Sequence, residues 1–459
     1  MNLKEKIEAR EATLSVIGLG YVGLPLAVVF AEAGFRVIGV DTDTERVASV
    51  NRGESYIEDV PSETLARLLP DTARPDGAPA LTRGGRGTGS LSATTDYNVL
   101  GDIDAVLMCV PTPLSKTKDP DVSYILAATD EVAMRLRPEM LVVLESTTYP
   151  GTTEELILPR LEQAGGQQLK AGSDFFLVYS PERIDPGRGN QAIRSTPKVL
   201  AGTTPACLDA GKALYGCVVD NLVSVSSPAT AEMVKLLENT FRATNVALVN
   251  EIAIMCDRLG IDVWEVIDAA GTKPFGFMSF YPGPGLGGHC IPVDPHLLAW
   301  KLKTLDYHAR FIHLAEEINL GMPLYWVTKV QDALNQIGKA VNGSNVLVIG
   351  VTYKPDVADI RESPAIDIID ELLRRGALVS YHDARVPVLE TETFRLTSLG
   401  DAELDKGLSE ADCLVIATDH STYDWEAVRR QTSLIVDTRN ALGNLPSEPA
   451  AAPTAASDD

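Results

Sequence analysis

Three glycines near the amino terminus constrain the fold of this chain more than any other feature. The apolar run "TLSVIGLG" (13–20) leads into a G-x-G-x-x-G pattern formed by Gly18, Gly20 and Gly23. A helical stretch, "LPLAVVFAEAG", and a second apolar run, "FRVIGVD", follow it. A strand that turns through glycines into a helix, and then into a second strand, is typical of a βαβ unit in a parallel sheet.

The same glycines indicate a dinucleotide site. Gly18 permits the tight turn, Gly20 lets a pyrophosphate approach the backbone, and Gly23 lets helix and strand pack closely, with the pyrophosphate at the helix N-terminus. Asp41 ends the second strand 18 residues after Gly23, where an acid accepts hydrogen bonds from ribose hydroxyls. Its carboxylate would repel a 2′-phosphate and so favours NAD over NADP, although Arg46 could hold such a phosphate.

Strands and helices alternate in two separate regions. Short apolar runs at 104–111, 141–147 and 175–182 continue the first region, and runs from residue 345 onward form the second. Between them, from about 230 to 320, only helical patterns occur. The predicted fold class is therefore α/β, with two doubly wound, parallel-sheet Rossmann-like domains joined by a helical middle domain.

The predicted domain boundaries follow these changes of pattern. We expect a dinucleotide-binding Rossmann domain at 1–205, a helical middle domain at 206–328, a carboxyl-terminal Rossmann-like domain at 329–445 and a disordered tail at 446–459. Residues 70–90 are rich in Gly, Pro and Arg with little to bury, which indicates a flexible insertion.

The charge balance excludes several classes of partner. The chain has 63 acidic and 40 basic residues, a formal net charge of −23, so we expect no nucleic acid and no anionic membrane as partner. No apolar run approaches the roughly 18 residues of a membrane helix, and the charged amino terminus lacks the apolar core of a signal peptide. We therefore expect a cytoplasmic protein that holds anionic ligands with helix N-termini and a few well-placed cations.

The loop "PGPGLGGHCIPVDP" (282–295) contains the most reactive side chain types. Cys290 is open to three interpretations: a nucleophile, a small buried hydrophobe, or half of a metal site with His289. The metal interpretation is weak because adjacent side chains diverge and no second Cys/His pair has ligand spacing, so we predict no metal. Lys235 and Asn239, at i and i+4, share one face of a helix, which by itself also fits an ordinary solvated surface.

Seven separated motifs carry a resemblance to a known family. From about Thr13 to Asn440 the chain resembles the nucleotide-sugar 6-dehydrogenases of the UDP-glucose/GDP-mannose dehydrogenase family. The motifs occur in family order: "GLGYVGLPLA", "CVPTP", "ESTTYPGTTEE", "SPERIDPG", "AEMVKLLENT", "GPGLGGHCIPVDP" and "GVTYKPDVADIRESP". The resemblance implies a UDP-binding carboxyl-terminal domain, a UDP-sugar substrate, two NAD reduced per C6 alcohol oxidised to a carboxylate, and a homodimer or higher homo-oligomer.

The resemblance also implies catalytic roles. Cys290, as thiolate, would add to the intermediate aldehyde, and the thiohemiacetal would become a thioester that water hydrolyses. Lys235 and Asn239 would stabilise the oxyanion, and Lys235 would favour the thiolate. Asp294, four residues after Cys290, would hold the water together with Thr147.

Glu182 of "SPER" is the further candidate for general acid/base work. In the UDP-glucose enzymes a second glutamate follows it by four residues, but here that position is Pro186, with Asp185 adjacent. A simple assignment to two glutamates therefore does not transfer.

The resemblance further implies two sets of binding residues. Lys354 would contact the UDP-sugar and Arg361 would reach towards NAD, although a surface loop with an ordinary ion pair at Asp359 also fits this stretch. The implied cofactor-binding residues are Gly18, Gly20, Tyr21, Val22, Gly23, Asp41, Arg46, Pro111, Thr112, Thr147 and Arg361. The implied substrate-binding residues are Glu182, Arg183, Lys235, Asn239, Lys273, Gly287, Arg310 and Lys354.

The cysteine loop also favours one branch of the family. The glucose branch typically has a loop like "GGSCFPKD", whereas this loop is "GGHCIPVDP", with His289 for serine and Val293 for lysine. This form resembles enzymes acting on UDP-N-acetylhexosamines, which feed surface polysaccharide synthesis. "CIPVDP" is closest to the N-acetylglucosamine enzymes, so we rank UDP-N-acetylglucosamine first, UDP-N-acetylmannosamine second and UDP-glucose third.

Two functions of other classes remain as alternatives. A two-electron dehydrogenase of the 3-hydroxyacid type has a similar front domain but does not need Cys290. A non-catalytic nucleotide-sugar binding protein would need neither Cys290 nor two NAD.

Overall fold

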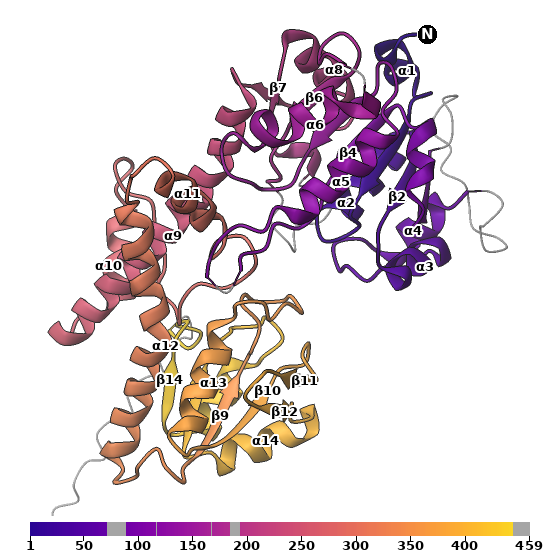
Figure 1. Cartoon of the computed structure of the whole chain (residues 1–459). Coiled ribbons are helices and arrows are strands. Elements are labelled where there is room, and N and C mark those ends of the chain that lie inside the picture. The colour runs from indigo at the N-terminus through magenta and orange to yellow at the C-terminus, as the bar shows by residue number, and fades with distance from the viewer. Residues whose placement is uncertain (71–88, 116, 167, 184–192, 444–459) are drawn as a thin grey trace, which may run out of the picture. The chain divides into compact units, whose positions relative to one another are not determined.

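The chain forms two compact units. The computed structural model describes residues 1–70, 89–115, 117–166, 168–183 and 193–443 (Figure 1). Unit 1 comprises Met1–Arg242 and Val293–Ile312, and unit 2 comprises Ala243–Pro292 and His313–Asp459. Nearly all of the predicted insertion at 70–90, and the whole predicted tail at 446–459, lie outside the described residues.

The sheet of unit 1 has eight strands in the order β3-β2-β1-β4-β5-β6-β7-β8. Strands β3 to β6 are parallel, as predicted, but β6 and β7 pair antiparallel, so β7 and β8 run against the rest of the sheet. The predicted strands are therefore parallel, and the antiparallel edge is formed by β7 and β8, which were not predicted. The strands are β1 (Thr13–Ile17), β2 (Arg36–Val40), β3 (Ser90–Thr94), β4 (Ala105–Met108), β5 (Leu141–Leu144), β6 (Phe176–Tyr179), β7 (Lys198–Gly202) and β8 (Leu222–Ser224).

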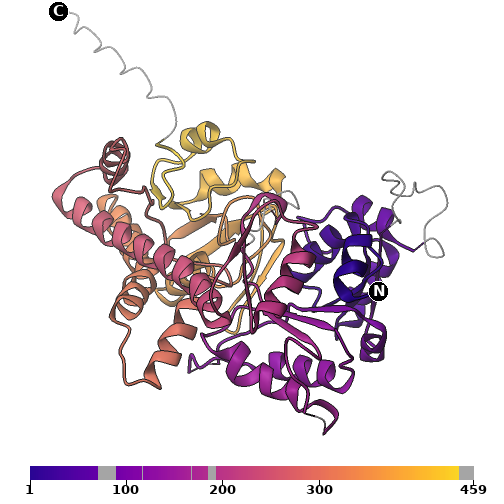
Figure 2. The ribbon, with the colours of Figure 1, turned by 90° about the horizontal axis from the view of Figure 1, so that it is seen from above.

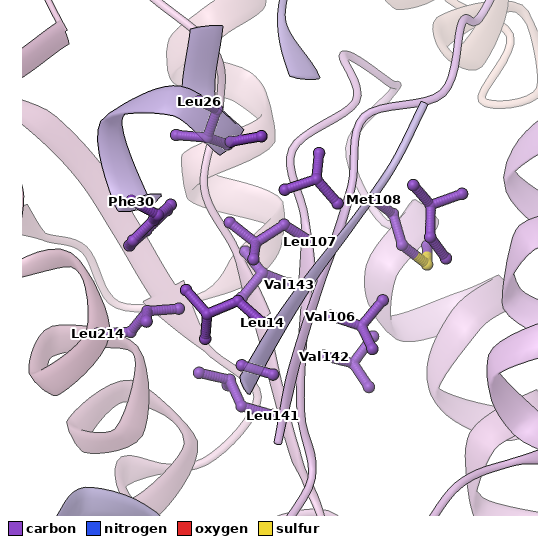
Figure 3. Packing of buried hydrophobic residues seen from close by; sticks show 14 of the residues in the cluster. Leu14, Leu26, Phe30, Val106, Leu107, Met108, Leu141, Val142, Val143 and Leu214 are labelled. Carbon is purple, nitrogen blue, oxygen red and sulfur yellow. The ribbon is translucent and has the colours of Figure 1, made fainter. Parts of the chain in front are cut away.

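Helices cover both faces of this sheet. Figure 3 shows Leu26 and Phe30 of α2 and Leu214 of α8 on one side of the central strands, with Val106, Val142 and Met108 pointing to the other. Strands β1, β4, β5 and β6 bury both faces, which explains why they are largely apolar runs. The helices of unit 1 that precede the middle region are α1 (Leu3–Ala9), α2 (Gly23–Glu32), α3 (Thr44–Arg52), α4 (Ser62–Leu68), α5 (Ser123–Met134), α6 (Leu158–Glu162) and α8 (Pro205–Tyr215), with short η1 (Tyr97–Asp102), η2 (Thr153–Ile157) and η3 (Ala164–Gly166). Helix α11 (Asp294–Lys303), in the middle region, also belongs to unit 1.

The middle region is helical, as predicted. Helix α9 (Pro228–Leu259) is uninterrupted (Figures 1 and 2) and ends at Gly260, whose φ of 68° suits a helix terminus. It is followed by α10 (Val263–Gly271), and α12 (Arg310–Gln336) continues beyond residue 328 with Pro323 inside it. No strand occurs between residues 230 and 320, all of which the structure describes.

Unit 2 contains a second, smaller parallel sheet, in the order β10-β9-β13-β14. Alternate residues of β9 (Asn345–Ile349) enter different cores: Val346 and Val348 pack with α12 and α13 (Pro364–Arg374), while Leu347 and Ile349 pack with α14 (Asp401–Glu410) and α15 (Trp425–Gln431). The remaining strands are β10 (Leu378–His382), β13 (Cys413–Ile416), β14 (Ile435–Asp437) and an unpredicted antiparallel pair, β11 (Val388–Glu390) and β12 (Arg395–Thr397).

These two sheets and the helices between them confirm the predicted fold class. Among the described residues, no helix combines the length and the apolar character needed to cross a bilayer.

Candidate active site

The glycine turn after β1 has the geometry expected of a pyrophosphate cradle. Gly18 has a φ of 89°, and a Cβ at Gly23 would lie 1.8 Å from the carbonyl oxygen of Gly18. A Cβ at Gly20, by contrast, would meet no protein atom within 4 Å. Helix α2 begins at Gly23, and no side chain caps its N-terminus, so its first N–H groups suit an anion.

Asp41 is braced at the end of β2. Its Oδ2 accepts a hydrogen bond from the backbone N–H of Leu19 (2.7 Å), and Oδ1 accepts one from the N–H of Asp43 (2.9 Å). Arg46 lies beside it, with Nη1 3.8 Å from Asp41 Oδ2, and its guanidinium lies 5.9 Å from the centre of the Tyr56 ring. Arg46, which could hold a 2′-phosphate, thus lies next to Asp41, the acid that would bind the ribose.

The ends of β4 and β5 are tied together beside this turn. Thr112 Oγ1 donates a hydrogen bond to the carbonyl oxygen of Thr147 (2.7 Å), and Ser146 Oγ donates one to that of Val110 (2.7 Å). Pro111 and Thr112 follow β4, and Thr147 follows β5, so both segments lie at the carboxyl edge of the sheet, where ligands bind in such folds. Tyr21 is exposed at the start of the glycine turn.

A buried ionic cluster lies under Glu182, which follows β6. Lys198 Nζ lies 2.6 Å from Glu145 Oε2, 4.0 Å from Glu182 Oε2 and 3.3 Å from the carbonyl oxygen of Pro181. Tyr215 donates a hydrogen bond to Glu145. Burial raises the pKa of Glu145, against the effect of Lys198, while the two glutamates raise the pKa of Lys198 despite its burial.

Arg183 joins the "SPER" segment to α9. Its Nη2 and Nε donate hydrogen bonds to the two carboxylate oxygens of Glu238 (2.5 and 3.2 Å), and Nη1 donates to the carbonyl oxygen of Pro197 (2.5 Å). This fork-to-carboxylate geometry is a strong ion pair. Arg183 therefore acts in the structure as a tie between segments, next in the chain to Glu182.

One face of α9 carries the polar side chains of the site. Glu232 is fully buried, and its carboxylate accepts hydrogen bonds from the N–H groups of Gly151 (2.6 Å) and Thr153 (2.9 Å) and from the Thr153 hydroxyl (2.7 Å). Lys235 and Asn239 follow at i+3 and i+7 on the same face. The structure therefore excludes the interpretation of Lys235 as an ordinary solvated lysine, since only 7% of it is exposed.

Asp294 meets these two side chains. Asn239 Nδ2 donates a hydrogen bond to Asp294 Oδ2 (2.5 Å). Burial raises the pKa of Asp294 to about 6, although the Lys235 charge and the Asn239 hydrogen bond each lower it. The sequence had placed Asp294 in the cysteine loop, whereas it is the first residue of α11, where an acid is also favoured by the helix dipole.

The cysteine loop belongs to unit 2. The N–H of Gly283 donates to Asn250 Oδ1 of α9 (2.9 Å), and the N–H of Gly288 donates to the carbonyl oxygen of Arg361 (2.9 Å). A Cβ at Gly287 would lie 2.6 Å from Cβ of Tyr353, so the loop lies directly on the 353–364 segment. Cys290 itself is exposed, which excludes the interpretation as a buried hydrophobe.

The other predicted residues of unit 2 include Arg361, Lys354, His289 and Lys273. Arg361 forms a bidentate ion pair with the buried Asp359 (Nη2 to Oδ2, 2.6 Å), and Lys354 is half-buried. His289 is half-buried, and its burial, together with the Arg361 charge, lowers its pKa. Lys273 is exposed, with Nζ 4.9 Å from the centre of the Phe275 ring.

The structure adds little to three further predictions, which concern Arg310, the position of Pro186 and the absence of a metal. Arg310 begins α12 and is exposed. Asp185 and Pro186 lie outside the described residues, so the departure from the two-glutamate pattern stays as the sequence left it. Among the described residues, no cluster of three His, Cys, Asp or Glu side chains could hold a metal ion.

Comparison with known proteins decides the family. Residues 12–74 and 75–219 match the NAD binding domain, 229–320 the central domain, and 347–444 the UDP binding domain of the UDP-glucose/GDP-mannose dehydrogenase family. The chain belongs to this family. Its cofactor is NAD, and its activity is that of an NAD-dependent nucleotide-sugar dehydrogenase.

Relatives match along almost their whole length. A UDP-N-acetyl-D-mannosamine dehydrogenase of Methanococcus maripaludis is 32% identical over 94% of this chain and 93% of its own. An NDP-N-acetyl-D-galactosaminuronic acid dehydrogenase of Ralstonia nicotianae is 34% identical over 93% and 95%. The solved structure of a UDP-D-ManNAc dehydrogenase of Pyrococcus horikoshii has a TM-score of 0.81 and 31% identity, covering 95% of this chain and 97% of that one.

Sequence reasoning missed several residues that position the site. Glu232, Glu145, Lys198 and Glu238 are charged residues whose partners lie far away in the chain. Glu232 and Glu238 flank the predicted Lys235 on α9, and the spacing of Glu232, Lys235 and Asn239 was the available signal that one polar face is buried.

A matched pair of glycine variants tests the pyrophosphate cradle. Gly23→Ala places a Cβ on the Gly18 carbonyl oxygen, so we expect a large fall in melting temperature. Gly20→Ala meets no protein atom, so its melting temperature should stay that of the wild type while its affinity for NAD falls at least about tenfold, which corresponds to about 1.4 kcal/mol. Calorimetry of NAD binding checks this, and wild-type NAD affinity in Gly20→Ala would contradict the assigned cradle.

Proposed function

We propose that this protein oxidises the C6 alcohol of a UDP-N-acetylhexosamine to the uronic acid, through a thiohemiacetal and a thioester on Cys290. The observation that carries the proposal is that Asp294, which follows the exposed Cys290 by four residues, is buried with Lys235 and accepts a hydrogen bond from Asn239. A lysine, an amide and a carboxyl group of raised pKa are the types of side chain that such chemistry requires.

We propose UDP-N-acetyl-D-mannosamine as the first candidate substrate. This reverses the order inferred from "CIPVDP", which had placed UDP-N-acetylglucosamine first. The reversal is supported by the relatives from Methanococcus maripaludis and Pyrococcus horikoshii, whose names specify N-acetylmannosamine. UDP-N-acetylglucosamine is the second candidate. The Ralstonia nicotianae relative is named for N-acetylgalactosaminuronic acid, so a UDP-N-acetylgalactosamine substrate is the third. UDP-glucose ranks below these because His289 and Val293 replace serine and lysine of the glucose branch.

The first oxidation needs removal of one proton from the C6 hydroxyl. NAD, when bound, accepts a hydride in each of the two oxidation steps. A water held by Asp294 and Thr147 would take up the hydroxyl proton, with Asp294 as carboxylate. Lys235 would stabilise the oxygen as it becomes negative, because a buried ammonium acts there in a low-dielectric site.

The second oxidation needs a covalent bond. The Cys290 thiolate would attack the aldehyde carbon, and Lys235 and Asn239 would stabilise the oxygen of the resulting tetrahedral centre. Loss of hydride from that carbon leaves the thioester, and water then releases the carboxylate product and regenerates the thiolate. Glu182, held over Lys198, is the proposed general acid/base in this hydrolysis.

Binding roles follow from the same assignment. Lys354, Arg183, Lys273, Gly287 and Arg310 are proposed to line the substrate site, and Arg361 to reach NAD. The domain boundaries at 205, 328 and 445 likewise stay a proposal, as does the link to surface polysaccharide synthesis.

A homo-oligomer is also part of the proposal. Helix α9 exposes a stripe of large apolar side chains at spacings of four and seven, which places them along one side of the helix: Met233, Leu237, Phe241, Leu248, Met255 and Leu259. A second copy of the chain would cover such a stripe.

The stoichiometry of NADH tests the proposed reaction. Incubation with each UDP-sugar and NAD should give two NADH per sugar consumed and a uronic acid product, fastest with UDP-N-acetyl-D-mannosamine. Detection of one NADH per sugar would favour a two-electron dehydrogenase, and detection of none with any UDP-sugar would favour a binding protein. Faster turnover of UDP-glucose than of every 2-acetamido sugar would contradict the proposed substrate class.

The pKa of Asp294 predicts the acid side of the pH–rate profile. Because its carboxylate form is required, kcat/KM should fall as the pH drops through about 6. Asn239→Ala removes a hydrogen bond that lowers this pKa, so the profile should move to higher pH. Fitting kcat/KM against pH for both proteins checks this, and an unmoved profile would assign the titration to another group, such as His289.

The same carboxyl group has a signature in stability. Its folded pKa is raised above the unfolded value of about 3.9, so its contribution is most favourable below that value and is lost as the pH rises to about 6. Asp294→Asn removes this dependence. The melting temperature of the variant minus that of the wild type should therefore increase from pH 4 to pH 6. A difference that stays constant over this range would contradict the raised pKa.

A further inference from the structure

A buried histidine–aspartate pair lies under the segment that carries Lys354. His420 follows β13 and Asp383 follows β10, the two strands that flank β9, and only 2% and 1% of these residues are exposed. His420 Nε2 lies 3.1 Å from Asp383 Oδ2. None of the roles assigned above uses either residue.

The hydrogen bonds fix the tautomer of His420. Its Nδ1 accepts from the backbone N–H of Asp356 (3.0 Å), so Nδ1 carries no proton and Nε2–H donates to Asp383. Asp383 also accepts from the N–H groups of Val351 (2.8 Å) and Arg385 (2.9 Å). Although burial raises it, these bonds hold the pKa of Asp383 below its usual range. The Nε2–H of the imidazole is thus bound to Asp383, and Nδ1 accepts a hydrogen bond from the 352–356 turn.

The turn above needs such support. Asp356 has a φ of 60°, in the left-handed region, which is unfavourable for most side chains. Its Oδ1 accepts from the N–H of Ser421 (3.1 Å), and the Thr352 hydroxyl donates to the carbonyl oxygen of Lys354 (3.0 Å). The backbone is therefore fixed on both sides of Lys354, partly by the residues next to His420.

The same turn supports the cysteine loop. Tyr353, next to Lys354, lies against the backbone of Gly287 and Gly288, because a Cβ at these glycines would come within 2.6 and 2.9 Å of its side chain. The N–H of Gly288 donates to Arg361 at the far end of the same segment (2.9 Å). A displacement of the 352–356 turn would therefore move Tyr353, against which the loop of Cys290 packs.

We propose that His420 is a positioning residue: held by Asp383, it fixes the Lys354 turn and, through Tyr353, the loop that carries Cys290. The inference rests on the proposed function for the roles of Lys354 and Cys290. It adds a physical link between binding of the nucleoside diphosphate and placement of the nucleophile, both within unit 2.

The chain offers a matched control in its second buried histidine of this domain. His382 is 3% exposed, and its ring contacts the Tyr423 hydroxyl (2.7 Å) and Asp401 Oδ1 (3.1 Å), with no ring contact to the 352–364 segment among these bonds. His420→Ala and His382→Ala thus remove the same side chain at similar depth. His420→Asn retains an acceptor at the position of Nδ1 and loses the contacts of Nε2 with Asp383 and with the Thr352 hydroxyl (3.3 Å).

Two measurements on the full-length protein test the proposal. Calorimetry measures the affinity for UDP alone, and hydrogen exchange measures protection of the Gly288 amide, which requires no ligand. In His420→Ala we expect UDP binding weaker, and exchange at Gly288 faster, each by about tenfold, as loss of a buried hydrogen bond implies. His382→Ala should stay within about twofold of the wild type, and His420→Asn should recover most of the loss.

The outcomes separate the two proposals. Equal effects of His420→Ala and His382→Ala, or no recovery in His420→Asn, would overturn the positioning role, since cavity formation alone would then account for the change. If His420→Ala behaves as expected but the wild type forms no NADH from any UDP-sugar, the proposed function fails while the positioning of the turn stands.

Discussion

The carboxylate of Glu232 holds α9 against the body of unit 1, and the polar face of that helix depends on it. A fully buried carboxylate is costly unless it is hydrogen-bonded, and here three donors from residues 151–153 satisfy it. Burial still raises its pKa, against the effect of these bonds. The segment it binds begins at Gly151, four residues after Thr147. This contact therefore positions Lys235 and Asn239 near the end of β5, and Asn239 in turn donates a hydrogen bond to Asp294.

An acidic chain must also hold anionic ligands, and it does so with few cations. Among the described cations of the site, several are already paired: Lys198 with Glu145, Arg183 with Glu238, and Arg361 with Asp359. These pairs place segments and orient carboxylates, while backbone N–H groups at the glycine turn and at the start of α2 are left to meet a pyrophosphate. A cofactor cradle made of backbone is compatible with a net charge of −23.

Much of the fold was predictable from local pattern, and much of the supporting network was not. Strands β1, β4, β5 and β6 are buried on both faces and, like β2, were visible as apolar runs, and Gly260 marked the end of α9. Strands β3 and β7 were missed because they contain polar residues such as Ser90 and Lys198, and β8 was missed because it has only three residues. The site residues came from motifs, but the partners of Lys198 and Glu232 lie 53 and about 80 residues away, so no local pattern identifies these charges as buried. The same distance hid the support of the Cys290 loop by Tyr353.

The central claim is that Cys290 is the nucleophile of the reaction, and partial alkylation tests it most directly. The protein is treated with iodoacetamide for increasing times, and mass spectrometry then measures the modified fraction of each of the six cysteines while NADH formation from the UDP-sugar is assayed. We predict that residual activity falls in proportion to alkylation of Cys290, the cysteine that the structure shows exposed, while the buried Cys207, Cys256 and Cys413 remain unmodified. Full activity in protein whose Cys290 is completely alkylated would contradict the account.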